Sequence, residues 1–299
     1  MFNKRRNYLA VNLILLVSFT SCVNLQHVNK FATTSVEALA RQDDIGYSFT
    51  QHCLDFECKK DIYHIPDVTK DFGKAAPCNC DTFKKADDAL DLFNSVLTAY
   101  LTGLANLSDS KAVNYNFDNL IKAVDVDEIA GQLKITKPEM TSLGNLATII
   151  SNDLMNLYRK RKLKEIIKKS NTDFGIVISA YRKCVNDFFK NVLLDNDLNI
   201  TLPNLYSTYF ITNAALLSPL EKARIYEEYL ARRATFETYK ALTARLVFAL
   251  DEIKDGHNKL NEESDHLTRN DLKQLINEYS TDIRAALGEF RKLKKSNQN

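Results

Sequence analysis

Apolar residues recur at alternating steps of three and four along four long segments of this chain, and this spacing restricts its fold more than any other feature. The four seams are Phe83, Ala86, Leu90, Phe93, Leu97, Tyr100, Leu104, Leu107; Phe174, Val177, Tyr181, Cys184, Phe188, Val192; Tyr229, Arg232, Phe236, Tyr239, Thr243, Leu246, Leu250, Ile253, His257, Leu260; and Leu272, Ile276, Tyr279, Ile283, Ala286, Phe290, Leu293. In the third of these, seven of the ten positions are apolar. Such spacing places side chains on one stripe of an α-helix, whereas a strand needs period two. The sequence therefore predicts an all-α fold, an elongated antiparallel helical bundle with coiled-coil-like seams.

Two helix starts carry a specific signal. Ser218-Pro219-Leu220-Glu221 and Thr136-Lys137-Pro138-Glu139 both have the spacing of a capping box with an early proline. A helix that runs from Ser218 to Lys254 would be about 50 Å long at about 1.5 Å per residue. We also expect short helices at 112–124 and 127–133 and a loop at 199–204, where Pro203 lies.

Composition excludes several classes of protein. Eight glycines and five prolines among 299 residues disfavour a turn-rich β-sandwich or barrel and leave no glycine-rich phosphate loop. Without residues 1–21 the chain has 37 basic and 38 acidic residues, so it lacks the basic excess typical of nucleic-acid binding. We expect no nucleic-acid partner.

The N-terminus has the layout of an export signal. Lys4, Arg5 and Arg6 precede a short apolar stretch, Tyr8–Phe19, which ends in Thr20-Ser21-Cys22. A basic region, an apolar region and small residues before a cleavage site indicate a secretory signal. The stretch is shorter than the roughly 20 apolar residues that span a bilayer. The segment could be an ordinary cleaved signal peptide or an uncleaved anchor, and the residues around Cys22 indicate a third interpretation.

Cys22 and the two small residues before it resemble the lipobox of bacterial lipoproteins, with Phe19 where that family prefers Leu, Val or Ile. The resemblance covers about 22 residues. It implies a diacylglycerol on the Cys22 thiol, cleavage before Cys22, and acylation of the new amino terminus. Two or more acyl chains hold a protein stably on a membrane. Val23, in place of Asp, implies the outer membrane, and the lack of an acidic cluster after Cys22 implies its periplasmic face.

These patterns divide the chain into four parts. We expect a signal peptide at 1–21, a lipidated tether at 22–36, a Cys-rich cap or loop segment at 37–81, and a helical bundle domain at 82–299.

Four cysteines lie within 28 residues, in the segment richest in turn residues: Cys53, Cys58, Cys78 and Cys80. In an oxidising compartment disulfides are the leading interpretation, and four cysteines allow three pairings that the sequence does not separate. Free thiols and a metal site near His52 and His64 are the alternatives, although the spacing departs from that of paired C-x2-C zinc motifs. Cys184 lies in a seam, which predicts a buried apolar role.

A basic run is the candidate anion or partner contact. Its members are Arg159, Lys160, Arg161, Lys162, Lys164, Lys168 and Lys169. A protruding cationic helix end can bind lipid headgroups, anionic glycan or an acidic partner, and a solvated helix end is the alternative interpretation.

No sequence motif indicates catalysis. Glu263 and His266 have the E-x-x-H spacing of di-iron bundles, but a second copy is missing. The chain has neither H-E-x-x-H nor G-x-S-x-G. Of the seam residues, His257 is interpreted as a core or boundary histidine, and Arg232 and Thr243 as the limit of a partner helix. We therefore expect no catalytic residue, no metal and no cofactor.

The sequence predicts a class of function and no specific activity. It indicates a membrane-anchored envelope protein whose bundle serves as a non-enzymatic scaffold or as a subunit that binds a protein partner. The alternative is a lipid- or glycan-binding module that uses an interhelical pocket or the basic run at 159–169. A metal- or redox-active protein built on the cysteine cluster is the third possibility.

Overall fold

A computed structural model describes residues 25–58, 78–109, 133–151 and 161–296 of the chain. The α-helices in this part are α2 (Gln26–Leu39), α3 (Phe49–His52), α5 (Asp81–Ser108), α7 (Lys137–Ile149), α8 (Arg161–Lys183), α9 (Leu202–Asn213), α10 (Pro219–Glu262) and α11 (Asn270–Ser296). The π-helical segments are Cys53–Glu57, Cys184–Leu194 and Asp197–Thr201, and short 3-10 turns lie at Asp43–Ile45 and Ser264–His266. No strand occurs in the described ranges.

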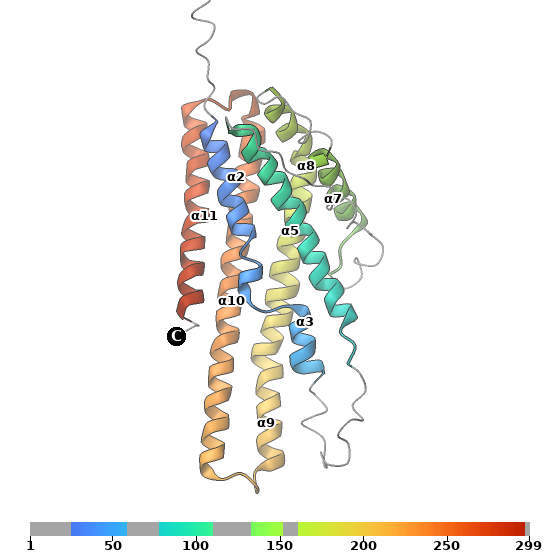
Figure 1. The fold of residues 1–299 in the computed structure, drawn as a ribbon, viewed down its shortest axis with the longest axis vertical. Coiled ribbons are helices and arrows are strands. Elements are labelled where there is room, and N and C mark those ends of the chain that lie inside the picture. Colours follow the sequence, from blue (N-terminus) through green and yellow to red (C-terminus); the bar gives the residue numbers. More distant parts are fainter. Residues whose placement is uncertain (1–24, 59–77, 110–132, 152–160, 297–299) are drawn as a thin grey trace, which may run out of the picture.

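The helices form an elongated bundle around α10 (Figure 1). Helix α11 turns back antiparallel to α10, and α2 packs between α11 and α5. On the other side α8 contacts α10 and α5, and α7 packs on α8. The chain continues from α8 through the π-helical segments into α9, which lies beside the first half of α10. The all-α bundle predicted from the seams is confirmed.

The seam positions supply the core. In α5 every seam residue from Ala86 to Leu107 is buried, and in α10 burial extends along the seam from Thr243 to Leu260. In α11 the buried seam residues include Ile276, Ile283 and Phe290. Burial of a large apolar side chain stabilises a fold by about 1.5–3 kcal/mol, so these stripes hold the bundle together.

Both capping boxes are present. The Glu221 carboxylate accepts from the Ser218 N–H at 2.8 Å, and the Ser218 hydroxyl accepts from the Glu221 N–H at 3.3 Å. Thr136 and Glu139 make the same reciprocal pair. Helix α10 has 44 residues, which corresponds to about 66 Å, so it extends past the expected end.

The seam in α8 changes register where the helix becomes π-helical. The spacing predicts burial at Phe188 and Val192, but Val192 is 61% exposed and the buried residues are Phe189 and Leu193. A π-helical turn contains about one more residue than an α-helical turn. The face toward the core therefore advances by one position after Cys184.

Three boundaries differ from the sequence prediction. Residues 26–36 are not a tether, because Val28, Phe31 and Ala32 form a short apolar stripe that packs in the core. The described part of 37–81 also belongs to the bundle, because Phe49 and Phe56 are buried in the same core. The predicted loop at 199–204 is helical. Proline fixes φ at a helical value, so Pro203 is compatible with the first turn of α9, which continues directly from the π-helical segment.

Helices α2 and α10 approach closely at Gly256. A Cβ atom placed on Gly256 would lie 2.4 Å from Cε2 of Phe31. The absence of a side chain here therefore lets the Phe31 ring lie against the α10 backbone.

The expected helix at 112–124 lies outside the described residues, as does the expected helix at 127–133 apart from Leu133, which lies in a turn. Among the residues that are described, no helix has both the length and the apolar character required to cross a bilayer.

Candidate functional site

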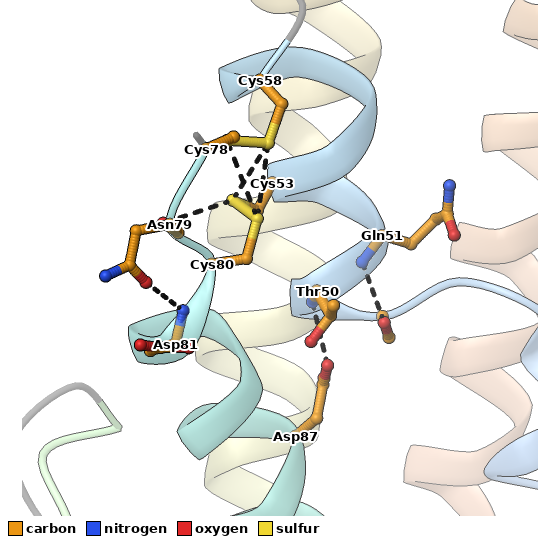
Figure 2. The surroundings of a disulfide bond; sticks show 10 residues. Thr50, Gln51, Cys53, Cys58, Cys78, Asn79, Cys80, Asp81 and Asp87 are labelled. Atoms are coloured by element: carbon orange, nitrogen blue, oxygen red, sulfur yellow. Dashed lines mark hydrogen bonds between the residues drawn. A yellow bond between two sulfur atoms is a disulfide. The ribbon is translucent and has the colours of Figure 1, made fainter. Parts of the chain in front are cut away.

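The four cysteines pair as Cys53–Cys80 and Cys58–Cys78, with Cα–Cα distances of 5.9 and 5.3 Å. Figure 2 shows both bonds between the π-helical turn that follows α3 and the chain that enters α5. Two of the three pairings left open by the sequence are thereby excluded. The disulfides fasten the α3 segment to the start of α5.

Hydrogen bonds reinforce this attachment from the α5 side. The Asp87 carboxylate accepts from the backbone N–H groups of Phe49 and Thr50, each at 2.9 Å. Figure 2 shows the bond to Thr50. Ser48 caps the same short helix by accepting from the Gln51 N–H at 3.0 Å. A carboxylate at a helix N-terminus satisfies free donors and the helix dipole. Asp87 thus fixes the start of α3 to α5 beside the two disulfides.

A buried polar cluster includes His52, the residue that precedes Cys53 in the chain. Asp197 is fully buried, and one oxygen, Oδ2, accepts from the Tyr47 hydroxyl at 2.7 Å and lies 2.8 Å from Nδ1 of His52. Its second oxygen, Oδ1, has no partner among the described protein atoms. The cluster joins the α3 segment to the π-helical segment that leads into α9.

No sequence pattern marked this cluster. Tyr47, His52 and Asp197 are separated by up to 150 residues, and none belongs to a motif. The immediate neighbours of Asp197 are mostly polar (Asp195, Asn196 and Asn199), so the local sequence gives no sign of its burial. Aspartate is almost never fully buried without a partner.

A half-open cavity of about 450 Å³ lies beside the cluster. Its lining includes Tyr47, Asp43, Asp87 and Asp91. Burial raises the pKa of Asp91 above its ordinary value, and the nearby carboxylates, Asp43 first, raise it further. Three carboxyl groups therefore line the cavity, and their negative charge disfavours an anionic ligand.

The structure describes only part of the basic run. Arg159 and Lys160 lie outside the described residues, as does the side chain of Arg161. Lys164 and Lys168 both form ion pairs with Asp265 in the turn between α10 and α11. Their hydrogen bonds, that of Lys164 first, lower the pKa of Asp265 to about 2.

The lysines of the run and the apolar residues between them differ in burial. Lys162, Lys168 and Lys169 are exposed, whereas Leu163 and Ile166 are buried in the core. This part of α8 is therefore an integral side of the bundle with a solvated charged face.

His257 is a core histidine, as its seam position predicted. It is fully buried, with Nε2 2.8 Å from the Tyr100 hydroxyl and Nδ1 3.1 Å from Oδ1 of Asn171. The Phe174 ring stacks on it at 4.0 Å between centroids. Burial lowers the pKa of His257 to about 3, so the ring is neutral. Cys184 is buried and unpaired, in agreement with its predicted apolar role.

Glu263 and His266 lie in the turn between α10 and α11. Glu263 forms ion pairs with Lys259 and Arg269 at 3.7 and 3.8 Å. This glutamate stabilises the turn through surface charges.

The helical hairpin of α9 and the first half of α10 is the second candidate site, and we call residues 202–235 the arm. From Pro203 to Thr235 no side chain is buried. Ile211, Leu216 and Leu220 are 78%, 82% and 80% exposed, and they surround the turn between the helices. Figure 1 shows the arm extending beyond the level of α3, away from the turn that joins α10 to α11.

The arm has an unusual charge distribution. Residues 198–220 contain no aspartate, glutamate, lysine, arginine or histidine. A hollow of about 160 Å³ lies between its helices, lined by Leu205, Tyr206, Tyr209, Ile225 and Glu228. Exposed apolar groups that gather at one place mark interaction surfaces more often than scattered ones do. The arm is thus the apolar surface most open to a partner in the described structure.

Cys22 lies outside the described residues, so its lipidation stays a prediction. No protein-family model, no curated protein and no solved structure matches this chain.

Proposed function

We propose that this protein is a lipid-anchored lipoprotein of the bacterial cell envelope, whose helical bundle acts as a non-enzymatic scaffold or partner-binding subunit. The lipid on Cys22 would hold it on the periplasmic face of the outer membrane. The signal-like N-terminus and the two disulfides, which suit an oxidising compartment, support this location.

The exposed apolar arm carries the proposal. The start of α2 lies near the turn between α10 and α11, where Lys30 donates to Asn277 at 3.2 Å, and the arm lies at the other end of α10 (Figure 1). Cys22 is three residues before Leu25, which corresponds to at most about 10 Å of extended chain. The lipid would therefore lie near one end of α10, which is about 66 Å long, and the tip of the arm lies at the other end.

This polarity favours a protein partner. A bundle that stands away from its membrane presents Ile211, Leu216 and Leu220 to the periplasm, where another protein can bury them. Burying apolar area contributes about 25 cal/mol per Å², so a few such side chains suffice for a transient complex. The α9 side of such an interface needs no ionic complement, because α9 carries no charge.

The test is site-specific photo-crosslinking in cells. A photoreactive residue at Leu216 should crosslink to a defined protein, while the same residue at Thr281, exposed on α11, should give no such product. Crosslinks to lipid alone, or equal products at both positions, would show that the arm does not bind a protein.

The anchor needs a separate measurement. Metabolic labelling with a radioactive fatty acid should label the full chain, and Cys22→Ala should abolish the label. Persistent label in that variant would contradict lipidation at Cys22 and leave the crosslinking result intact.

A further inference from the structure

The two disulfides form a single compact cluster of four sulfur atoms. All four Sγ atoms of Cys53, Cys58, Cys78 and Cys80 lie within 4.8 Å of one another. Between the two disulfides, Cys58 is 3.5 Å from Cys80, Cys53 is 3.9 Å from Cys58, and Cys78 is 4.0 Å from Cys80. Figure 2 shows the sulfurs gathered between the two chain segments.

These distances match a tetrahedral metal site. Zinc binds thiolate sulfur at about 2.3 Å, so the edges of a ZnS₄ tetrahedron are about 3.8 Å long. Three of the four sulfur–sulfur distances between the disulfides are already close to that value, and the fourth is within 4.8 Å. After reduction, each former disulfide pair has to separate from about 2.05 Å to about 3.8 Å, a change within reach of small side-chain rotations.

The surroundings favour thiolates. Cys80 is the N-cap residue of α5, which has 28 residues. The Cys80 side chain makes no capping hydrogen bond, and Asn79 Oδ1 accepts from the Asp81 N–H at 2.8 Å. A helix N-terminus stabilises a nearby anion and lowers the pKa of a cysteine. Cys53 is buried, Cys58 and Cys80 are half-buried and Cys78 is exposed, so the cluster has one side closed to water and one side open.

We propose that these four cysteines form a tetrathiolate site for zinc or a similar soft divalent cation when they are reduced, and that the two disulfides are the oxidised form of the same site. Two equivalents of a dithiol reductant would supply four electrons and four protons, converting both S–S bonds to thiols while becoming disulfides themselves. The metal then displaces the four thiol protons. Two equivalents of a small disulfide reverse the reaction by oxidising the four thiolates and releasing the ion. The inference is independent of the function proposed for the arm.

The experiment uses the mature chain with Cys22→Ser. After reduction with a phosphine in the absence of oxygen, cobalt(II) is titrated as a spectroscopic probe. We expect one ion per chain, with the absorption of tetrahedral cobalt–thiolate coordination, and displacement by zinc. The oxidised protein should bind none.

Two variants make the result specific. Cys78→Ser should weaken cobalt binding about a hundredfold, because it removes a ligand. Cys184→Ser is the matched control, since this cysteine is buried away from the cluster, and it should bind cobalt like the parent. Helical circular dichroism of each reduced variant reports whether the bundle persists.

The proposal fails if the reduced chain shows no stoichiometric cobalt–thiolate absorption, whether or not its helices persist. It fails equally if Cys78→Ser binds as tightly as the parent. A chain produced without residues 1–21 in a reducing cytoplasm offers a second route, because it should be isolated with zinc.

Discussion

The two halves of helix α10 differ in burial, although the helix is continuous. From Pro219 to Thr235 none of its side chains is buried, whereas Phe236 to Leu260 contributes eleven buried residues to the core. The first half has α9 as its main neighbour, and the second half is surrounded by α2, α8 and α11. A capping box and the local sequence are enough to start a helix, but burial depends on how many neighbours surround it.

The arm is held by surface contacts. The Tyr206 hydroxyl donates to Glu228 at 2.8 Å, and the rings of Tyr206 and Tyr229 meet at 5.3 Å. Such exposed pairs contribute at most about 1 kcal/mol each. The body of the bundle instead depends on many buried apolar groups, so the two halves of α10 should respond differently to substitution.

The largest expected effect is a leucine truncation in the body. Leu250→Ala removes a fully buried side chain and should lower the free energy of unfolding by about 3 kcal/mol. Leu230→Ala, in the same helix but 45% exposed, should lower it by less than about 1 kcal/mol. Urea denaturation of both variants measures the difference. Equal losses would mean that the arm is as tightly packed as the body.

The close contact of α2 with α10 gives the next largest effect. Gly256→Ala forces a methyl group against the Phe31 ring and should cost about 2 kcal/mol. Gly288→Ala in α11 is the control, because no atom lies within 4 Å of the new Cβ, and it should stabilise the protein by up to about 1 kcal/mol. A neutral Gly256→Ala would show that α2 is loosely attached and would revive the tether interpretation of residues 26–36.

The pH dependence of the free energy of unfolding tests a buried group of the body, His257. The pKa of His257 is about 3 in the folded protein, below its ordinary value of 6.5, so between these values the unfolded chain binds a proton that the folded protein does not. Stability is therefore lost as the pH falls below about 6.5. His257 alone should cost about 1 kcal/mol between pH 6 and pH 5.

Thermal or urea unfolding at several pH values measures this slope. His257→Gln should reduce it, and the remaining slope should include His27, whose pKa is lowered to about 4 by burial and by Lys273. An unchanged slope in the variant would contradict a neutral buried His257.

The smallest effect concerns the cap at the arm. Ser218→Ala removes the acceptor of the Glu221 N–H and should destabilise the first turn of α10 by about 1 kcal/mol. Because Leu202 is the one residue of the arm that is buried in the core, faster amide hydrogen exchange should be confined to residues near 218–225. Faster exchange spreading to Leu250 would show that the arm and the body unfold together.

Some features were readable because they depend on neighbours in the chain. The seams, both capping boxes and the buried position of Cys184 follow from spacing and side-chain chemistry over a few residues. Residues 26–36 were misassigned because Val28, Phe31 and Ala32 make too short a stripe to stand out beside the longer seams. The change of register after Cys184 escaped notice because α- and π-helical turns leave the same apolar composition.

The candidate sites were less predictable. The Cys-rich segment was recognised from composition, whereas Asp197 and Tyr47 were not, since their partners are 145–150 residues away. The basic run was recognised too, but its partner Asp265 lies on another turn. A charge in a sequence shows only that a partner is needed, and the fold supplies it.

By itself the sequence determined that this chain is helical, where two helices begin, which stripe of α5, α10 and α11 is apolar, and that four cysteines share one segment. Only the tertiary structure decided the pairing Cys53–Cys80 and Cys58–Cys78, the burial of α2, and the division of α10 into a packed half and an exposed arm. The physical reason is that hydrogen bonding and side-chain spacing within a helix are local, whereas burial and disulfide pairing depend on which distant segments meet.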